Sequence, residues 1–83
     1  MDDEVRTALE ELAVWAAVNV GHAPGRLEKR LVLMNAFAEA DRITEAAIGK
    51  PDLALLDALL DEPEMLIPNL QRLWIGDDDV CSR

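Results

Sequence analysis

Two segments of this 83-residue chain carry apolar side chains on nearly every side of a helix, and this constrains the fold more than any other feature. Residues 12–18 (LAVWAAV) are apolar throughout, and residues 31–38 (LVLMNAFA) contain one polar side chain, Asn35. A helix that packs on one neighbour needs only one apolar stripe, whereas a helix that is apolar all round needs cover on several sides. Small domains bury only about 60% of the surface that their unfolded chains expose. We therefore expect either a tight wrap from the C-terminal segments or cover from a second copy or a partner.

Glycine and proline divide the chain into segments whose apolar residues recur at helical spacing. Helices are predicted from residue 2 or 3 to 20, 25 to 48, 51 to 61 and 68 to 74 or 75, where Gly76 ends the last one, with a short helical turn within 62–67. No stretch of useful length alternates apolar and polar residues with a period of two, so we expect no strands. The predicted class is all-α, a small bundle of about four helices, two longer and two short. Residues 1–76 would form one domain, and residues 77–83 an acidic flexible tail.

The apolar stripes of the predicted helices provide the candidate core and the candidate self-association surface. In the second segment an apolar stripe recurs at helical spacing, and we expect it to face the core. It consists of Leu27, Leu31, Met34, Ala38 and Ala46, widened by Phe37 and Ile43. Because 12–18 and 31–38 are apolar beyond a single stripe, other residues in or beside them would remain for a homodimer. The residues predicted for self-association are Val14, Trp15, Val18, Leu33 and Phe37.

The charges are unevenly distributed along the chain. There are 17 acidic and 8 basic residues, a net charge of −9, and residues 51–83 alone carry eight acidic and two basic side chains. Affinity for nucleic-acid phosphates and for anionic lipid comes from Lys and Arg, so direct binding to either is not expected. A concentrated acidic surface instead favours a basic protein partner. The residues predicted to bind that partner are four carboxylates and an adjoining apolar pair: Asp57, Asp61, Glu62, Glu64, Leu70 and Trp74.

Arg26, Lys29 and Arg30 form the one basic cluster of the sequence, at the start of the second predicted helix. The helix dipole disfavours positive charge at that end. Two interpretations follow. The three side chains pair with acidic groups elsewhere in the domain, for which the C-terminal Asp run is a candidate, or they bind an anion or an acidic partner.

Residue types that carry chemistry are scarce. The chain has one His and one Cys, and its single Ser is Ser82, close to the C-terminus. We therefore predict no catalytic, cofactor-binding or metal-binding residues and no enzymatic activity. The longest uncharged run, residues 12–25, is shorter than the roughly 20 apolar residues of a membrane-spanning helix. Because the first residues are acidic, where a secretory signal is basic and then apolar, we expect a cytoplasmic protein without membrane association.

These observations predict a protein that acts by binding. The leading hypothesis is a small acidic helical module, a bacterial or phage accessory or inhibitor protein, that binds a larger partner with a basic, nucleic-acid-handling surface. In one version its carboxylates take the place of nucleic-acid phosphates. The alternative is a structural homo-oligomer whose apolar helices, 12–18 and 31–38, self-associate. No cofactor is expected in either case.

Overall fold

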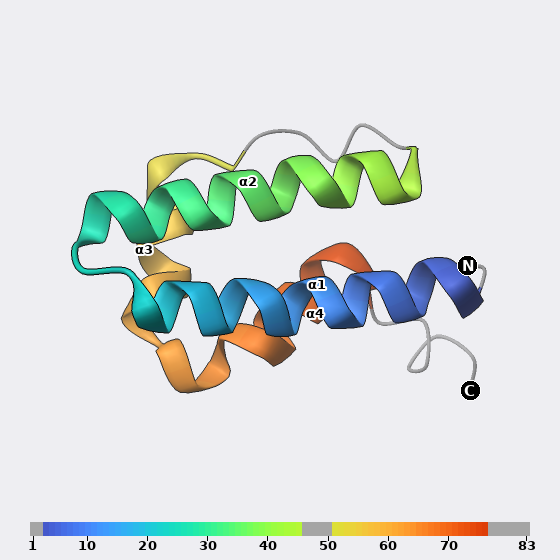
Figure 1. Cartoon of the computed structure of the whole chain (residues 1–83), viewed down its shortest axis with the longest axis horizontal. Coiled ribbons are helices and arrows are strands. Elements are labelled where there is room, and N and C mark those ends of the chain that lie inside the picture. Colours follow the sequence, from blue (N-terminus) through green and yellow to red (C-terminus); the bar gives the residue numbers. More distant parts are fainter. Residues whose placement is uncertain (1–2, 46–50, 77–83) are drawn as a thin grey trace.

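The computed structural model describes residues 3–45 and 51–76, and every regular element in these ranges is a helix. Helices α1 (Asp3–His22) and α2 (Arg26–Thr44) form an antiparallel hairpin. Helix α3 (Leu53–Asp61), a 3₁₀ turn (Pro63–Met65) and helix α4 (Leu66–Trp74) pack behind that hairpin in the view of Figure 1. The all-α class with two longer and two short helices is thus confirmed for the described residues.

The first two helices end at positions that differ from the predicted ones. Helix α1 continues through Gly21 to His22, because Lys29 Nζ donates hydrogen bonds to the carbonyls of Val20 (2.8 Å) and Ala23 (2.9 Å) and satisfies the exposed end. Helix α2 ends at Thr44, and Glu45 adopts the left-handed conformation with φ 55°. The last predicted residues of this helix, 46–48, lie outside the described ranges.

The start of α3 depends on a side-chain cap. The carboxylate of Asp52 accepts a hydrogen bond from the backbone N–H of Leu55 at 2.8 Å, so Asp52 is the N-cap. Pro51 therefore precedes the cap. The prediction that Pro51 is the first helical residue is wrong, because α3 begins at Leu53.

Helix α4 begins two residues earlier than predicted, at Leu66, which makes Pro68 its third residue. Proline is tolerated there because N–H groups of the first turn have no partner within the helix. Gly76 has φ 89° and donates its N–H to Gln71 O, which confirms the predicted end of this helix. The tail predicted for residues 77–83 lies outside the described residues.

The core lies between the α1–α2 hairpin and the C-terminal helices. Its aromatic centre is an edge-to-face pair, Phe37 and Trp74, whose ring centroids are 5.4 Å apart at 79°. The indole N–H of Trp74 is buried without a hydrogen-bond partner among the described residues. The buried apolar residues are Leu9, Ala13, Ala16, Val20, Leu33, Ala36, Phe37, Ala40, Leu56, Leu59, Leu66, Leu70, Trp74 and Ile75.

The core uses a different stripe of α2 from the predicted line of Leu27, Leu31, Met34 and Ala38, although Phe37 and Ile43, predicted beside that line, do belong to or pack against the core. Leu33 and Phe37 are 0% and 4% exposed, whereas the predicted core stripe that includes Leu31 faces outward. Ala36 and Ala40 lie beside Leu33 on the buried stripe, where their small side chains permit close approach of α1. The prediction that Leu33 and Phe37 mediate self-association is therefore wrong, because both are enclosed within the monomer.

Among the described helices, none has the length and apolar character needed to cross a membrane.

Candidate functional site

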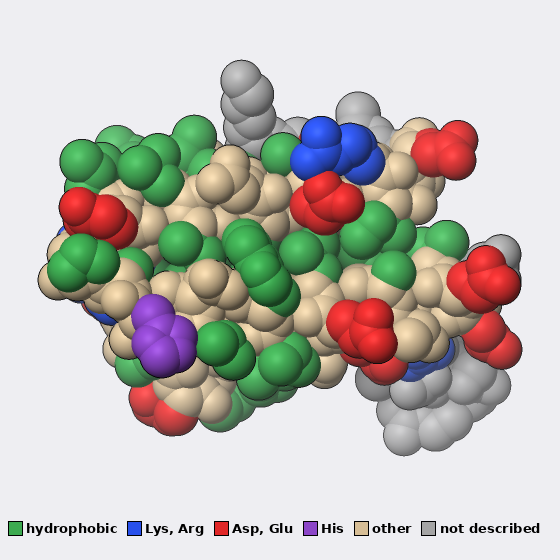
Figure 2. Space-filling view, viewed as in Figure 1, with side chains coloured by type: hydrophobic (Ala, Val, Ile, Leu, Met, Phe, Trp, Pro, Cys, Tyr) green, Lys and Arg blue, Asp and Glu red, His purple; other side chains and the backbone are tan. Residues whose placement is uncertain are grey.

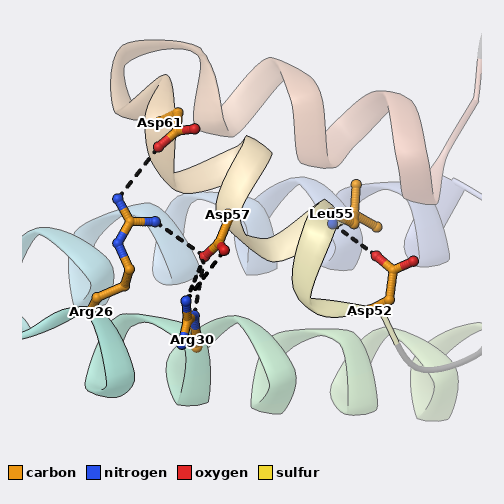
Figure 3. Close-up of polar contacts among 6 residues, drawn as sticks. All are labelled: Arg26, Arg30, Asp52, Leu55, Asp57 and Asp61. Atoms are coloured by element: carbon orange, nitrogen blue, oxygen red, sulfur yellow. Dashed lines mark hydrogen bonds and ion pairs between the residues drawn. The ribbon is translucent and has the colours of Figure 1, made fainter.

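The two arginines of the basic cluster of α2 pair with acidic residues of α3, whereas Lys29 bonds backbone carbonyls at the end of α1. Arg30 donates two hydrogen bonds to the carboxylate of Asp57, from Nε at 3.1 Å and from Nη2 at 3.0 Å. Arg26 Nη1 lies 3.1 Å from the same carboxylate. Arg26 Nη2 also reaches Asp61 at 3.4 Å, and Figure 3 shows the two arginines side by side beneath the acids. The interpretation that these arginines pair within the domain is thus correct, and their described partners lie on α3. The C-terminal Asp run that was the predicted candidate lies outside the described residues.

The pairing changes the electrostatics of both helices. Hydrogen bonds from Arg30 hold the pKa of Asp57 below its usual range, and the hydrogen bond with Asp57 raises the pKa of Arg26. Two of the four carboxylates predicted to bind a basic partner are therefore compensated by arginines of the same chain. Glu62 and Glu64 remain exposed near the end of α3.

The apolar members of the predicted partner surface are not on the surface. Leu70 is fully buried, and Trp74 packs against Phe37 in the core. Their inclusion in a partner-binding site is wrong, because the amphipathic α4 turns this stripe towards α1 and the interior. Leu73 of the same helix is exposed, beside a groove of about 220 Å³ between α3 and α4.

An exposed apolar ridge runs along the outer side of α2. Leu27, Leu31 and Met34 are 63%, 50% and 42% exposed, and Ala38 continues the same line. The intervals are four, three and four residues, which is the spacing of the contact positions in a coiled coil. Figure 2 shows hydrophobic side chains gathered over the α2 side of the molecule. This is a narrow seam suited to one further helix.

Helix α3 packs beside α2 and carries a further exposed apolar residue at its first position. The ion pairs set the register of α2 against α3, because Arg26 meets Asp61 and Arg30 meets Asp57. Leu53, the first residue of α3, is 62% exposed. We call four exposed apolar residues of α2 the outer ridge: Leu27, Leu31, Met34 and Ala38.

Helix α1 presents a second exposed set, the α1 patch, made of Val14, Trp15 and Val18. These are three of the five residues predicted for self-association, and they do lie on the surface. Trp15 borders a groove of about 500 Å³ between α1 and α2, whose other lining residues include Leu12 and Ala38. The outer ridge and this groove therefore share Ala38.

The described residues hold no cluster of three or more His, Cys, Asp or Glu side chains able to bind a metal ion. His22 lies exposed at the last position of α1. Comparison of the chain with protein-family models, curated proteins and solved structures finds no match. Function must therefore be inferred from the surfaces of this fold, of which the outer ridge is the one that the predicted partner and self-association residues omitted. The signal for it was the four-three-four spacing.

Proposed function

We propose that this chain is a small protein-binding module that docks an α-helix of another protein chain along the outer ridge. The observation that supports it most is that long apolar side chains of the ridge are 42–63% exposed on the described surface while α2 already buries a second complete stripe. Contiguous exposed apolar residues mark interaction sites more often than isolated ones do.

The spacing of the ridge favours a helical partner. Residues 27–38 span about 17 Å along the helix axis at 1.5 Å per residue. Side chains at alternating intervals of four and three residues insert between those of a second helix that runs alongside, as in coiled coils. A docked helix of about three turns would cover Leu27, Leu31 and Met34 together.

A second candidate keeps the acidic surface as the binding site for a basic partner. It is favoured by the exposure of Glu62 and Glu64 and by the net charge of −6 in residues 51–83. The internal pairing of Asp57 and Asp61 with arginines weakens it. The two candidates differ in their response to salt, since charge-driven binding weakens with ionic strength whereas apolar docking persists.

Comparative affinity capture from the native host tests the proposal. The bait is the wild-type chain, an outer-ridge variant (Leu31→Lys with Met34→Lys) or an α1-patch control (Val14→Lys with Val18→Lys). All four substituted positions are solvent-exposed and helical, so circular dichroism should show equal helicity for the three proteins. We expect proteins retained at high salt by the wild type and the control to be lost with the ridge variant. Equal capture by all three baits would contradict the proposal.

A further inference from the structure

We infer that the occupant of the outer ridge is a second copy of this chain, whose α2 packs antiparallel against the first across a two-fold axis. This inference rests on the proposed function, because it names the partner of the same surface. A symmetric dimer requires a surface that is complementary to itself. The outer ridge satisfies this condition in both shape and charge.

The outer ridge is complementary in shape to an antiparallel copy of itself. When a two-fold axis passes between residues 32 and 33, Leu27 lies opposite Ala38 of the second copy, and Leu31 lies opposite its Met34. A large side chain thus faces a small one at each end, and two long ones meet on either side of the axis. Ala38 also lines the groove beside Trp15, so the Leu27 side chain of the second copy has space at that end.

The net charge of each segment favours contact through α2. Two chains of −9 repel each other, but residues 22–50 carry five basic and four acidic side chains, whereas residues 1–21 have a net charge of −4 and residues 51–83 of −6. Two arginines beside the ridge are compensated within each copy, since Arg30 pairs with Asp57 and Arg42 pairs with Glu39. The α2 side is therefore where two copies meet with the least repulsion.

The position of Glu62 and Glu64 favours the antiparallel arrangement. Asp61 pairs with Arg26 at the start of α2, so Glu62 and Glu64 follow at that same end of the helix. A parallel pair of α2 helices would bring the two acidic ends together. An antiparallel pair separates them by the length of α2, about 28 Å for 19 residues and well beyond a Debye length of about 8–10 Å.

The ridge is short, so we expect a weak dimer with a dissociation constant in the high micromolar range. Sedimentation equilibrium of the wild type from about 10 µM to 1 mM should show the mean mass rising from 9.2 kDa towards twice that value. Leu31→Lys should raise the dissociation constant at least about tenfold, because it places a charge beside the axis. Val14→Lys, on the α1 patch, should leave the dissociation constant unchanged.

Disulfide trapping tests the direction of pairing. In a Cys81→Ser background, Leu27→Cys and Ala38→Cys proteins should cross-link with each other when they are mixed and oxidised. Each protein oxidised alone should cross-link much less. Efficient cross-linking of Leu27→Cys protein with itself would show a parallel pair and overturn the antiparallel inference.

Two outcomes of sedimentation would overturn self-pairing without overturning the proposed function. One is a wild-type mass that stays at 9.2 kDa up to 1 mM while the ridge variant still loses captured host proteins. In that case the ridge binds a different chain. The other is a dimer that dissociates with Val14→Lys but not with Leu31→Lys, which would assign self-association to the α1 patch.

Discussion

The two apolar stripes of α2 have similar hydrophobicity and opposite environments. The buried stripe combines Leu33 and Phe37 with two alanines, and the outer ridge carries Leu27, Leu31 and Met34 in succession. Alanines at Ala36 and Ala40 let α1 approach, and Phe37 then reaches Trp74 of α4. The difference shows that the fit of side chains against neighbouring helices, more than hydrophobicity, decides which stripe enters the core.

A matched pair of substitutions gives the largest expected contrast between the stripes. Leu33→Ala removes a fully buried side chain and should lower the free energy of unfolding by about 2–5 kcal/mol, since it leaves a cavity. Leu31→Ala removes the same atoms from an exposed position and should change the free energy of unfolding by less than about 0.5 kcal/mol. Urea unfolding at low micromolar concentration measures both. Equal losses would contradict the assignment of the two stripes.

The two tryptophans give a spectroscopic form of the same comparison. Trp74 is buried against Phe37, whereas Trp15 lies on the exposed α1 patch. The Trp15→Phe protein should emit at shorter wavelength and resist quenching by acrylamide. The Trp74→Phe protein should emit at longer wavelength and be quenched severalfold more strongly. The reverse order would contradict the placement of α4.

A smaller effect is expected at the α2–α3 ion pairs. Asp57 accepts hydrogen bonds from both arginines, whereas Asp61 has one contact at 3.4 Å. Asp57→Asn should therefore lower the midpoint of thermal unfolding more than Asp61→Asn, and both should lower it less than Leu33→Ala. Partly exposed ion pairs contribute little because water and salt screen them. A larger loss from Asp61→Asn would contradict this geometry.

The lowered pKa of Asp57 gives a pH dependence of known sign. Its stabilising contribution is complete above the unfolded pKa of about 3.9 and disappears as pH falls through the lower folded value. The stability of the wild type should therefore fall more steeply than that of Asp57→Asn below about pH 4. Chemical denaturation at a series of pH values would show parallel curves if the pairing did not form.

The sequence predicted the fold class well because the apolar spacing is helical throughout and because Gly and Pro lie within a few residues of the breaks between helices. It could not select the buried stripe of α2, since residues 31–38 are apolar on nearly every side. The pairing of Arg30 with Asp57 joins residues 27 positions apart and depends on how α3 packs. That packing converted two carboxylates of the predicted partner site into internal ion pairs and buried Leu70 and Trp74.

The central claim is that α2 has one stripe for the core and one for docking, and thiol reactivity tests it most directly. In a Cys81→Ser background, the thiol introduced by Leu31→Cys should react rapidly at about 1 µM and more slowly near 1 mM, where a second copy covers it. The thiol introduced by Leu33→Cys should react slowly at both concentrations in conditions where circular dichroism shows a folded chain. Equal rates for the two thiols at 1 µM would contradict the claim.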